Sequence, residues 1–194
     1  LARALDALAA KRWPGAGGYR TFLSNSGTEA NEAALKLAWL VKYRKFVRRH
    51  GLDLFRKLAA QLGVPEVTYF AGKGPEPVFA SYPFVVFACD GAFHGRTLGS
   101  LHATRSKAVH HYGYPKSPGI RHVPYNSGES LARWIDPRPV AEILEAPGGV
   151  RAVLDRGHVP ADLFAGFLAE PMQGEGGYVL ADPTFFKECE AVCR

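Results

Sequence analysis

The sequence predicts an α/β fold with a mostly parallel sheet flanked by helices, and three observations lead to this prediction. Residues 84–88 and 163–169 are short apolar runs, as expected of strands buried on both faces. Residues 27–49 carry apolar side chains at helical spacing. Strand-like and helix-like segments alternate along the chain, which is the order that builds a parallel sheet.

The composition is that of one ordinary globular domain. The chain has 194 residues, of which 47% are hydrophobic and 22% charged, so it has enough apolar material for one core. The longest apolar runs, such as residues 84–89, are too short to cross a bilayer, and no secretory signal opens the sequence. We therefore expect no membrane partner.

Charge and cysteine content narrow the classes of partner. A net charge of +6 suits a small anion such as phosphate, and the basic run at residues 42–49 is interpreted as a helix end rather than a nucleic-acid surface. Three cysteines, Cys89, Cys189 and Cys193, argue against a disulfide framework and favour a reducing, cytoplasmic location. Cys189 and Cys193 lie four apart on an expected helix, but no second pair completes a zinc site, so no metal is expected.

The N-terminal part begins with an expected helix. In order, the elements are a helix over residues 1–12, a Pro- and Gly-rich break at 14–18, a strand over 19–23 and a turn over 24–28.

The helix that follows is the clearest element of the sequence. One face is apolar, formed by Ala30, Ala33, Ala34, Leu37, Ala38 and Val41. Ser26 and Glu29, three residues apart, match a capping box at its start. Basic residues gather near its other end, where cations favour the dipole, and Gly51 suits the position just past that end.

The remaining elements alternate between helix and strand. They are a helix at 52–62, an irregular stretch at 63–83 with one strand near 67–70, the strand at 84–88 and a helix at 96–105. After these come a loop at 112–125 with a short strand at 120–123, helices at 140–146 and 150–155, the strand at 163–169, and a helix at 183–194 capped by Asp182.

Three segments carry residues suited to ligand binding. At the start of the long helix, free backbone amides, Gly27 and the hydroxyls of Ser26 and Thr28 form a cup for an anion; a capped helix without a ligand is the alternative interpretation. After the strand at 84–88, Phe93 is suited to stacking on a flat ring and His94 to hydrogen bonding, although both also suit a core.

The third segment, residues 170–177, has two carboxylates in a glycine-rich stretch. Glu170 and Glu175 follow the second buried strand, and a mobile carboxylate and a plain surface loop are both compatible with their spacing. The sequence contains neither a G-x-x-x-x-G-K-[ST] phosphate loop nor a G-x-S-x-G serine elbow.

Taken together and in this order, the three segments resemble the class-III aminotransferases, the family of acetylornithine, ornithine and 4-aminobutyrate aminotransferases. The matching stretches are FLSNSGTEANEAALKLA at residues 22–38, GAFHGRTLGSLHATRSKAVH at 91–110 and AEPMQGEGGYVLADPTFF at 169–186. The resemblance implies that residues 1–194 are part of the large domain of a fold-type I transferase with pyridoxal 5′-phosphate as cofactor. Two stretches, about residues 46–83 and 133–159, depart from the family pattern and are expected to be insertions.

The resemblance also implies roles for individual residues. Gly27 and Thr28, together with Ser26, hold the cofactor phosphate, Phe93 stacks on the pyridine ring, and His94 supports the site.

Two carboxylates of the third segment also receive roles from the resemblance. Glu170 lies close to the cofactor, and Glu175 is a gate that pairs with an arginine of the family's C-terminal part and moves aside for the second substrate.

The reaction implied is transfer of an amino group from a terminal-amine amino acid to a 2-oxo acid, usually in a homodimer. None of the nine lysines lies in the family's context for the Schiff-base lysine, and the aspartate that faces the pyridine nitrogen is also missing. We therefore expect the chain by itself to be an inactive fragment. An amino-acid racemase of the same family and a non-catalytic, anion-binding or structural remnant are the alternatives.

Overall fold

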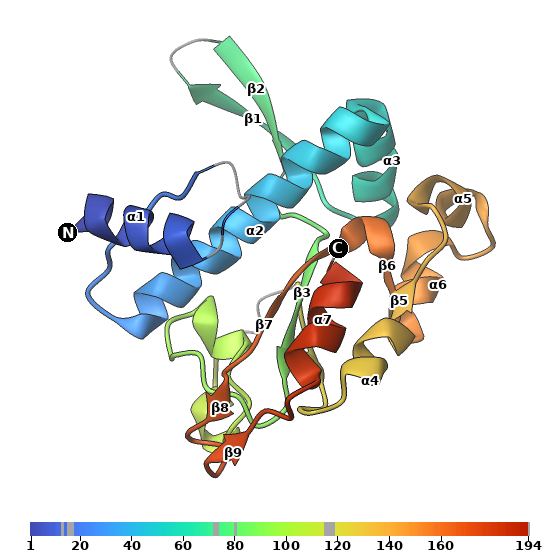
Figure 1. Ribbon diagram of the computed structural model, residues 1–194. Helices are drawn as coiled ribbons and strands as arrows, with labels where there is room; N and C mark the ends of the chain where they lie inside the picture. The colour runs from blue at the N-terminus through green and yellow to red at the C-terminus, as the bar shows by residue number, and fades with distance from the viewer. Residues whose placement is uncertain (13, 15–17, 72–73, 80, 115–118, 194) are drawn as a thin grey trace.

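The computed structural model describes the whole chain except residues 13, 15–17, 72–73, 80, 115–118 and 194 (Figure 1). Its centre is a parallel sheet in the order β4–β3–β7, formed by β4 (Ile120–Val123), β3 (Val85–Cys89) and β7 (Phe164–Leu168). All five residues of β3 are buried, as the apolar run at 84–88 predicts. The predicted α/β class with a parallel sheet is therefore confirmed, and the three strands lie within a residue or two of their expected positions.

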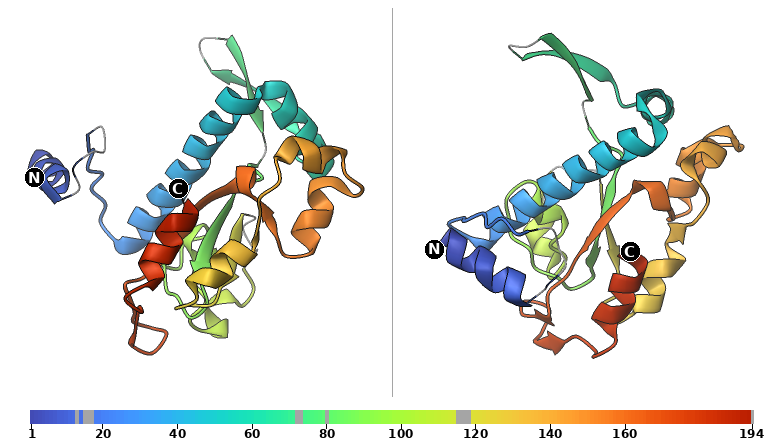
Figure 2. Two further views of the ribbon diagram at one scale, coloured as in Figure 1. Left: turned by 45° about the vertical axis from the view of Figure 1, so that its right-hand side comes forward. Right: turned by 45° about the horizontal axis from the view of Figure 1, so that its top comes forward.

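The longest helix, α2 (Gly27–His50), covers one face of this sheet, and α4 (Gly128–Arg133) and α7 (Phe185–Cys193) lie on the other side (Figure 2). The Ser26 side chain accepts a hydrogen bond from the Glu29 amide at 3.3 Å. The Glu29 carboxylate in turn accepts from the Asn25 amide at 2.7 Å rather than from Ser26, so the reciprocal bond of the capping box is shifted by one residue. At the far end, Gly51 has φ 84° and donates its N–H to the Val47 carbonyl.

The segment before α2 differs from the prediction. Helix α1 (Ala2–Arg12) forms as expected but buries none of its residues and lies at the periphery of the molecule (Figure 2). The strand expected at 19–23 is absent: these residues have no regular structure, and Phe22 and Leu23 are 70% and 55% exposed. Without a neighbouring strand among the described residues, an extended segment has no ladder of hydrogen bonds to join. The expected break at 14–18 lies largely outside the described residues.

Residues 63–83 form more structure than the sequence predicts. After α3 (Leu52–Leu62), an antiparallel hairpin of β1 (Glu66–Ala71) and β2 (Gly74–Phe79) projects from the body of the molecule (Figure 1). Only a strand near 67–70 was expected, because Pro75 and Pro77 disfavour a strand. In a two-stranded ribbon both strands are edges, so the prolines need not interrupt a ladder on their outer side.

The prediction of a helix at 96–105 is wrong. The segment contains only a 3-10 turn, η1 (Ser100–His102), followed by η2 (Ala108–His111). Gly95 has φ +116°, which lies outside the helical region, and the hydroxyls of Thr97 and Ser100 bind side chains of α2. Contacts with another element therefore decide this conformation.

The C-terminal half continues with short elements. They are β5 (Ile135–Asp136), α5 (Val140–Glu145), α6 (Gly149–Asp155), β6 (Val159–Pro160), η3 (Ala161–Leu163), β8 (Met172–Gln173) and β9 (Val179–Leu180). The predicted helices at 140–146 and 150–155 are confirmed, and α7 begins at Phe185, two residues later than expected. β5 pairs with β6 in parallel and β8 with β9 in antiparallel orientation, and these two-residue strands were not predicted.

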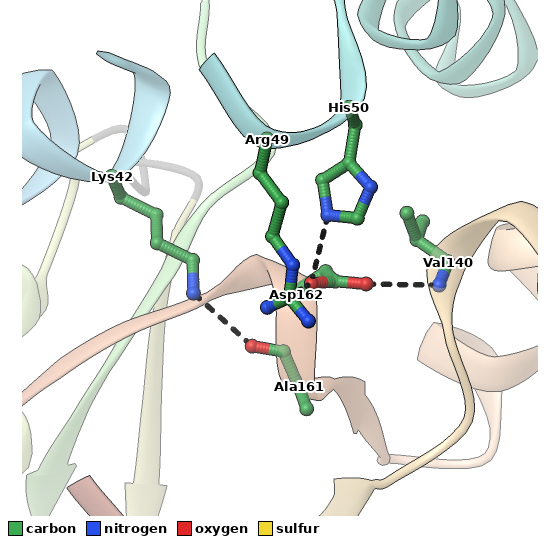
Figure 3. A network of polar contacts seen from close by, with 6 residues as sticks. All are labelled: Lys42, Arg49, His50, Val140, Ala161 and Asp162. Atoms are coloured by element: carbon green, nitrogen blue, oxygen red, sulfur yellow. Dashed lines mark hydrogen bonds and ion pairs between the residues drawn. The ribbon is translucent and has the colours of Figure 1, made fainter. Parts of the chain in front are cut away.

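The two stretches expected to be insertions contact each other. Gln61 of α3 accepts a hydrogen bond from the Val150 amide at 2.7 Å and donates to the Leu144 carbonyl at 3.4 Å. A second connection centres on Asp162, which accepts from the Val140 amide at 3.0 Å and contacts His50 Nε2 at 3.1 Å (Figure 3). These bonds join the end of α2 and α3 to the segment around α5 and α6.

A single aromatic-rich core underlies this arrangement. The largest fully buried side chains include Phe55, Phe84, Phe87, Phe185, Leu58 and Leu101. Trp39 of α2 packs against this core beside Gly119, where an added Cβ would lie 3.5 Å from the indole ring. Its Nε1 is buried and has no hydrogen-bond partner among the described residues. None of the described helices is long and apolar enough to span a bilayer.

Candidate functional site

The three segments singled out in the sequence come together at the carboxyl ends of β3 and β7. Asn31 of α2 donates its Nδ2 to the His94 carbonyl at 2.7 Å, and Thr28 lies 2.7 Å from the Ser100 hydroxyl. The Phe93 amide donates to Glu170 Oε2 at 3.0 Å. In open α/β sheets this edge is where ligands bind.

The start of α2 leaves its backbone open. A Cβ added at Gly27 would meet no described atom within 4 Å, so the space beside this residue is open. The Ser26 hydroxyl is used in capping, and the Thr28 hydroxyl lies between Ser100 Oγ and Thr97 Oγ1, which is 3.2 Å away. The Glu29 amide is used by the Ser26 cap, which leaves the Gly27 and Thr28 amides as the donors of this turn without a partner among the described residues, and the Thr28 hydroxyl also holds the neighbouring segment.

The turn after β3 requires its glycines. Gly91 has φ +78°, and an added Cβ there would lie 2.8 Å from Gln173 Oε1. Gly95 has φ +116°, and an added Cβ would overlap the Thr28 hydroxyl and lie 2.6 Å from Ser100 Oγ. These close approaches let the turn pass directly beside α2 and the segment after β7.

The side chains of Phe93 and His94 lie in different environments within this turn. The Phe93 ring is half-buried and meets the His110 ring edge to face, with centroids 5.7 Å apart. His94 is 5% exposed, and its backbone N–H donates to Thr104 Oγ1 at 2.8 Å. Burial lowers the pKa of His94 to about 4, so the ring is neutral at neutral pH. Its Nε2 is buried without a hydrogen-bond partner in the described part of the chain.

The two expected carboxylates lie at different depths. Glu170 binds the Phe93 amide, and its own carbonyl accepts from the Tyr125 hydroxyl at 2.9 Å. Glu175, in the turn between β8 and β9, is about half exposed and forms an ion pair with Lys107 at 2.7 Å. The hydrogen bond and charge of Lys107 lower the pKa of Glu175. The structure thus places Glu170 beside Phe93, whereas Glu175 is bound to a side chain that the sequence analysis did not select.

Several residues of this arrangement were missed in the sequence. They are Asn31, Glu32, Thr97, Ser100, Thr104 and Lys107. Asn31 and Glu32 lie one turn beyond Thr28, so their position on the same helix face was a usable signal. The hydroxyl residues gave no signal, because a helix was expected there.

A cavity of about 550 Å³ lies beside the segment after η1. It is lined by His102, His111 and His122 together with Arg105 and Lys107, and by none of the seven residues expected to bind cofactor or substrate. Among the residues that the structure describes, no group of three His, Cys, Asp or Glu side chains is arranged to hold a metal ion. The cysteines are free, with Cys89 and Cys189 buried and Cys193 exposed.

Comparison with known proteins points in one direction. The family model described as "Aminotransferase class-III" matches residues 2–194. An acetylornithine aminotransferase of Thermosynechococcus vestitus is 31% identical over 176 residues, covering 91% of this chain and 30% of the relative. That of Synechocystis sp. is 33% identical over 174 residues, covering 90% of this chain and 29% of the relative. The chain thus spans about a third of the length of these relatives.

Solved structures agree on the fold. An ornithine aminotransferase of Toxoplasma gondii superposes with a TM-score of 0.52 and 21% identity, covering 100% of this chain and 32% of the other. An (S)-enantioselective omega-transaminase of Thermomicrobium roseum gives a TM-score of 0.53 and 22% identity, covering 100% and 35%. At these identities the likeness supports the fold alone.

Proposed function

Because the chain belongs to the class-III aminotransferase family, whose enzymes use pyridoxal 5′-phosphate, we propose that the protein transfers an amino group from a terminal-amine amino acid to a 2-oxo acid. The observation that carries the proposal is the meeting of the open start of α2 with Phe93 and Glu170. This arrangement provides an anion cup, an aromatic ring and a carboxylate at one edge of the sheet.

The residues present fit the cofactor. The backbone amides at Gly27, with Ser26 and Thr28 around them, donate hydrogen bonds to its phosphate at the positive end of the helix dipole. Phe93 supports the face of its ring, and the free Nε2 of His94 lies in the same turn as a neutral imidazole.

The role of the cofactor, once bound, is to supply the electron sink, while the protein chain binds and orients it. The Glu170 carboxylate accepts a hydrogen bond from the Phe93 amide and so fixes the backbone of Phe93. It thereby sets the position of the side chain that contacts the cofactor ring. Glu175 is proposed as the movable carboxylate at the substrate side. It is exposed and its partner Lys107 lies on the surface, so exchange of partners costs little.

For the amino donor, we propose the class of acetylornithine, ornithine and 4-aminobutyrate. Relatives named acetylornithine aminotransferases favour the first of these donors. The test measures glutamate formed from 2-oxoglutarate and each donor by the protein that contains this chain. We expect transfer from at least one donor. Loss of optical activity of an amino acid without transfer would instead indicate a racemase.

We also propose that the protein is a homodimer in a reducing compartment such as the cytoplasm. Large apolar side chains are exposed near the start and middle of α2, namely Phe22, Leu23, Leu37, Leu40 and Val41. Large exposed apolar side chains on and before one helix favour an interface. Light scattering after size-exclusion chromatography tests the assembly, and a monomeric mass over a range of concentrations would contradict it.

A further inference from the structure

Glu32 lies one turn beyond Thr28 and accepts hydrogen bonds from three donors of the segment that follows Gly95. Its Oε1 receives the Gly99 amide at 2.9 Å, the Ser100 amide at 3.1 Å and the Thr97 hydroxyl. A charged acceptor makes such bonds about twice as strong as neutral ones. The carboxylate therefore anchors the beginning of η1 to α2.

The groups around Glu32 are hydrogen-bond donors that favour an ionised carboxylate. Partial burial by itself raises the pKa of Glu32, but the bonds from Thr97, Ser100 and Gly99 outweigh it, and the resulting pKa is lowered. Residue 99 must be small, because an added Cβ would overlap the Glu32 carboxylate group. The side chain is thus held ionised against backbone amides.

The same helix face carries two further bonds to the segment that bears the ring-binding residue. Thr28 contacts Ser100 Oγ at 2.7 Å, and Asn31 donates to the His94 carbonyl at 2.7 Å. Thr28, Asn31 and Glu32 are spaced three and four residues apart, so one rigid helix face holds residues 94–100. The start of this helix is also the proposed phosphate cup.

From this geometry we propose that Glu32 is a positioning residue, which sets the distance between the phosphate cup at Gly27 and the ring-binding side chain of Phe93. The inference rests on the proposed function, because it assumes that one ligand contacts both places. Loss of Glu32 leaves the cup itself intact, since the amides of the first turn of α2 do not depend on it. It releases the segment that leads to Phe93.

The experiment compares two ligands in the protein that contains this chain, freed of bound cofactor, and in two variants of it, Glu32→Ala and Glu32→Gln. Pyridoxine 5′-phosphate contains both phosphate and ring, and it lacks the aldehyde that would react with surface lysines. Inorganic phosphate contacts the cup alone. Dissociation constants are measured by equilibrium dialysis at low temperature, well below thermal unfolding, which is recorded separately for each variant.

We expect Glu32→Ala to weaken pyridoxine 5′-phosphate binding by about tenfold and inorganic phosphate binding by less than about twofold. Glu32→Gln keeps one acceptor oxygen, and we expect it to weaken pyridoxine 5′-phosphate binding by about threefold. This variant replaces Glu32→Ala in the test if the alanine variant does not fold. Glu142→Gln makes the same charge change on the exposed face of α5 and controls for net charge.

Each outcome bears on one claim. Equal weakening for the two ligands, or a lower melting temperature with unchanged affinities, would mean that Glu32 is only structural and would overturn the inference. If the unmodified chain binds pyridoxine 5′-phosphate and both variants bind it equally well, the inference alone fails. If the unmodified chain binds neither ligand, the proposed phosphate cup fails and the inference falls with it.

Discussion

His94 combines a buried ring, a free Nε2 and a pKa lowered from 6.5 to about 4. Between these two pH values the unfolded chain binds a proton at this residue and the folded chain does not. Stability associated with His94 is therefore complete above about pH 6.5 and falls as the pH is lowered toward 4. The His94 ring stays neutral only in the folded state, so protonation at acidic pH favours the unfolded chain.

Replacement of His94 should remove this part of the acid sensitivity. We expect His94→Gln to narrow the difference in unfolding free energy between pH 7.5 and pH 4 by about 3 kcal/mol relative to the unmodified chain. Urea unfolding at a series of pH values measures it. His158→Gln, at a half-buried histidine beside Trp134, controls for loss of an imidazole. An unchanged pH dependence in His94→Gln would show that the pKa of His94 is the same in the folded and the unfolded chain.

Gly95 offers a test of the close approach between the turn after β3 and α2. Gly95→Ala introduces a Cβ that overlaps the Thr28 hydroxyl at φ +116°, and we expect a loss of about 3 kcal/mol in unfolding free energy. Gly113 also has a positive φ, +76°, but open space around it, and Gly113→Ala should cost about 1 kcal/mol. Comparable losses in both variants would indicate that backbone strain, and not the contact with α2, governs this position.

Among elements, those with a strong local pattern were predicted correctly. The extent and end positions of α2, and the positions of β3 and β7, were read from neighbouring residues because helix and strand periodicity are local signals. The apolar face expected on α2 was wrong: Leu37 and Val41 are 56% and 46% exposed, and the helix buries Leu35 and Phe46 instead. Residues 19–23 and 96–105 were predicted wrongly because their conformation depends on partners far along the chain. Ser100, for example, binds Thr28 and Glu32 of α2 rather than completing a helix of its own.

In the candidate site, too, residues beside strongly patterned elements could be selected from the sequence, whereas residues whose partners lie far along the chain could not. Phe93 and Glu170 were expected in one site, and they are joined by a hydrogen bond. The helix that begins at Gly27 is bonded to the same turn through Asn31 and the His94 carbonyl. Their expected roles toward a cofactor stay predictions. Glu32 and Lys107 were missed, since a carboxylate in a helix and a lysine in a loop look like ordinary surface residues until their partners are known.

The connection through Asp162 gives a prediction for the elements that it joins. Burial by itself raises the pKa of Asp162, but the bonds from Val140 and His50 and the charges of His50 and Arg49 outweigh it, and the resulting pKa is lowered. A lowered carboxyl pKa contributes stability above the ordinary value of 3.8, and this contribution is lost as the pH falls through the folded value.

We therefore expect Asp162→Asn to lower the unfolding free energy by about 1 kcal/mol at neutral pH, with the deficit closing on acidification. Chemical unfolding at pH 7 and at pH 3 measures both effects. Asp53→Asn, which alters an exposed ion pair at the start of α3, should change stability little at either pH. A deficit for Asp162→Asn that does not shrink between pH 7 and pH 3 would assign its role to shape rather than to charge.

At the scale of the whole molecule, the three cysteines report on global opening. Burial raises the pKa of Cys89 to about 12 and that of Cys189 to about 11, whereas Cys193 is exposed at the end of α7. Reaction with a disulfide reagent requires both access and a thiolate. In the folded chain we expect rapid labelling of Cys193 alone, and labelling of Cys89 and Cys189 only at the rate of unfolding.

Mass spectrometry after timed labelling identifies the modified residues. Denatured chain should react at all three cysteines and provides the reference. Rapid labelling of Cys189 with Cys89 still protected would show that α7 opens from the sheet without global unfolding.

Trp39 occupies the seam between α2 and the turn that leads into β4, with its indole nitrogen buried beside Gly119. With the other two tryptophans, Trp13 and Trp134, replaced by Phe, its intrinsic fluorescence monitors whether the long helix is seated on the sheet. Because the same helix begins at the anion cup and continues to His50, a shift of Trp39 emission toward longer wavelength would signal separation of the cup from the sheet. The chain thus contains a built-in optical probe at the joint on which the proposed site depends.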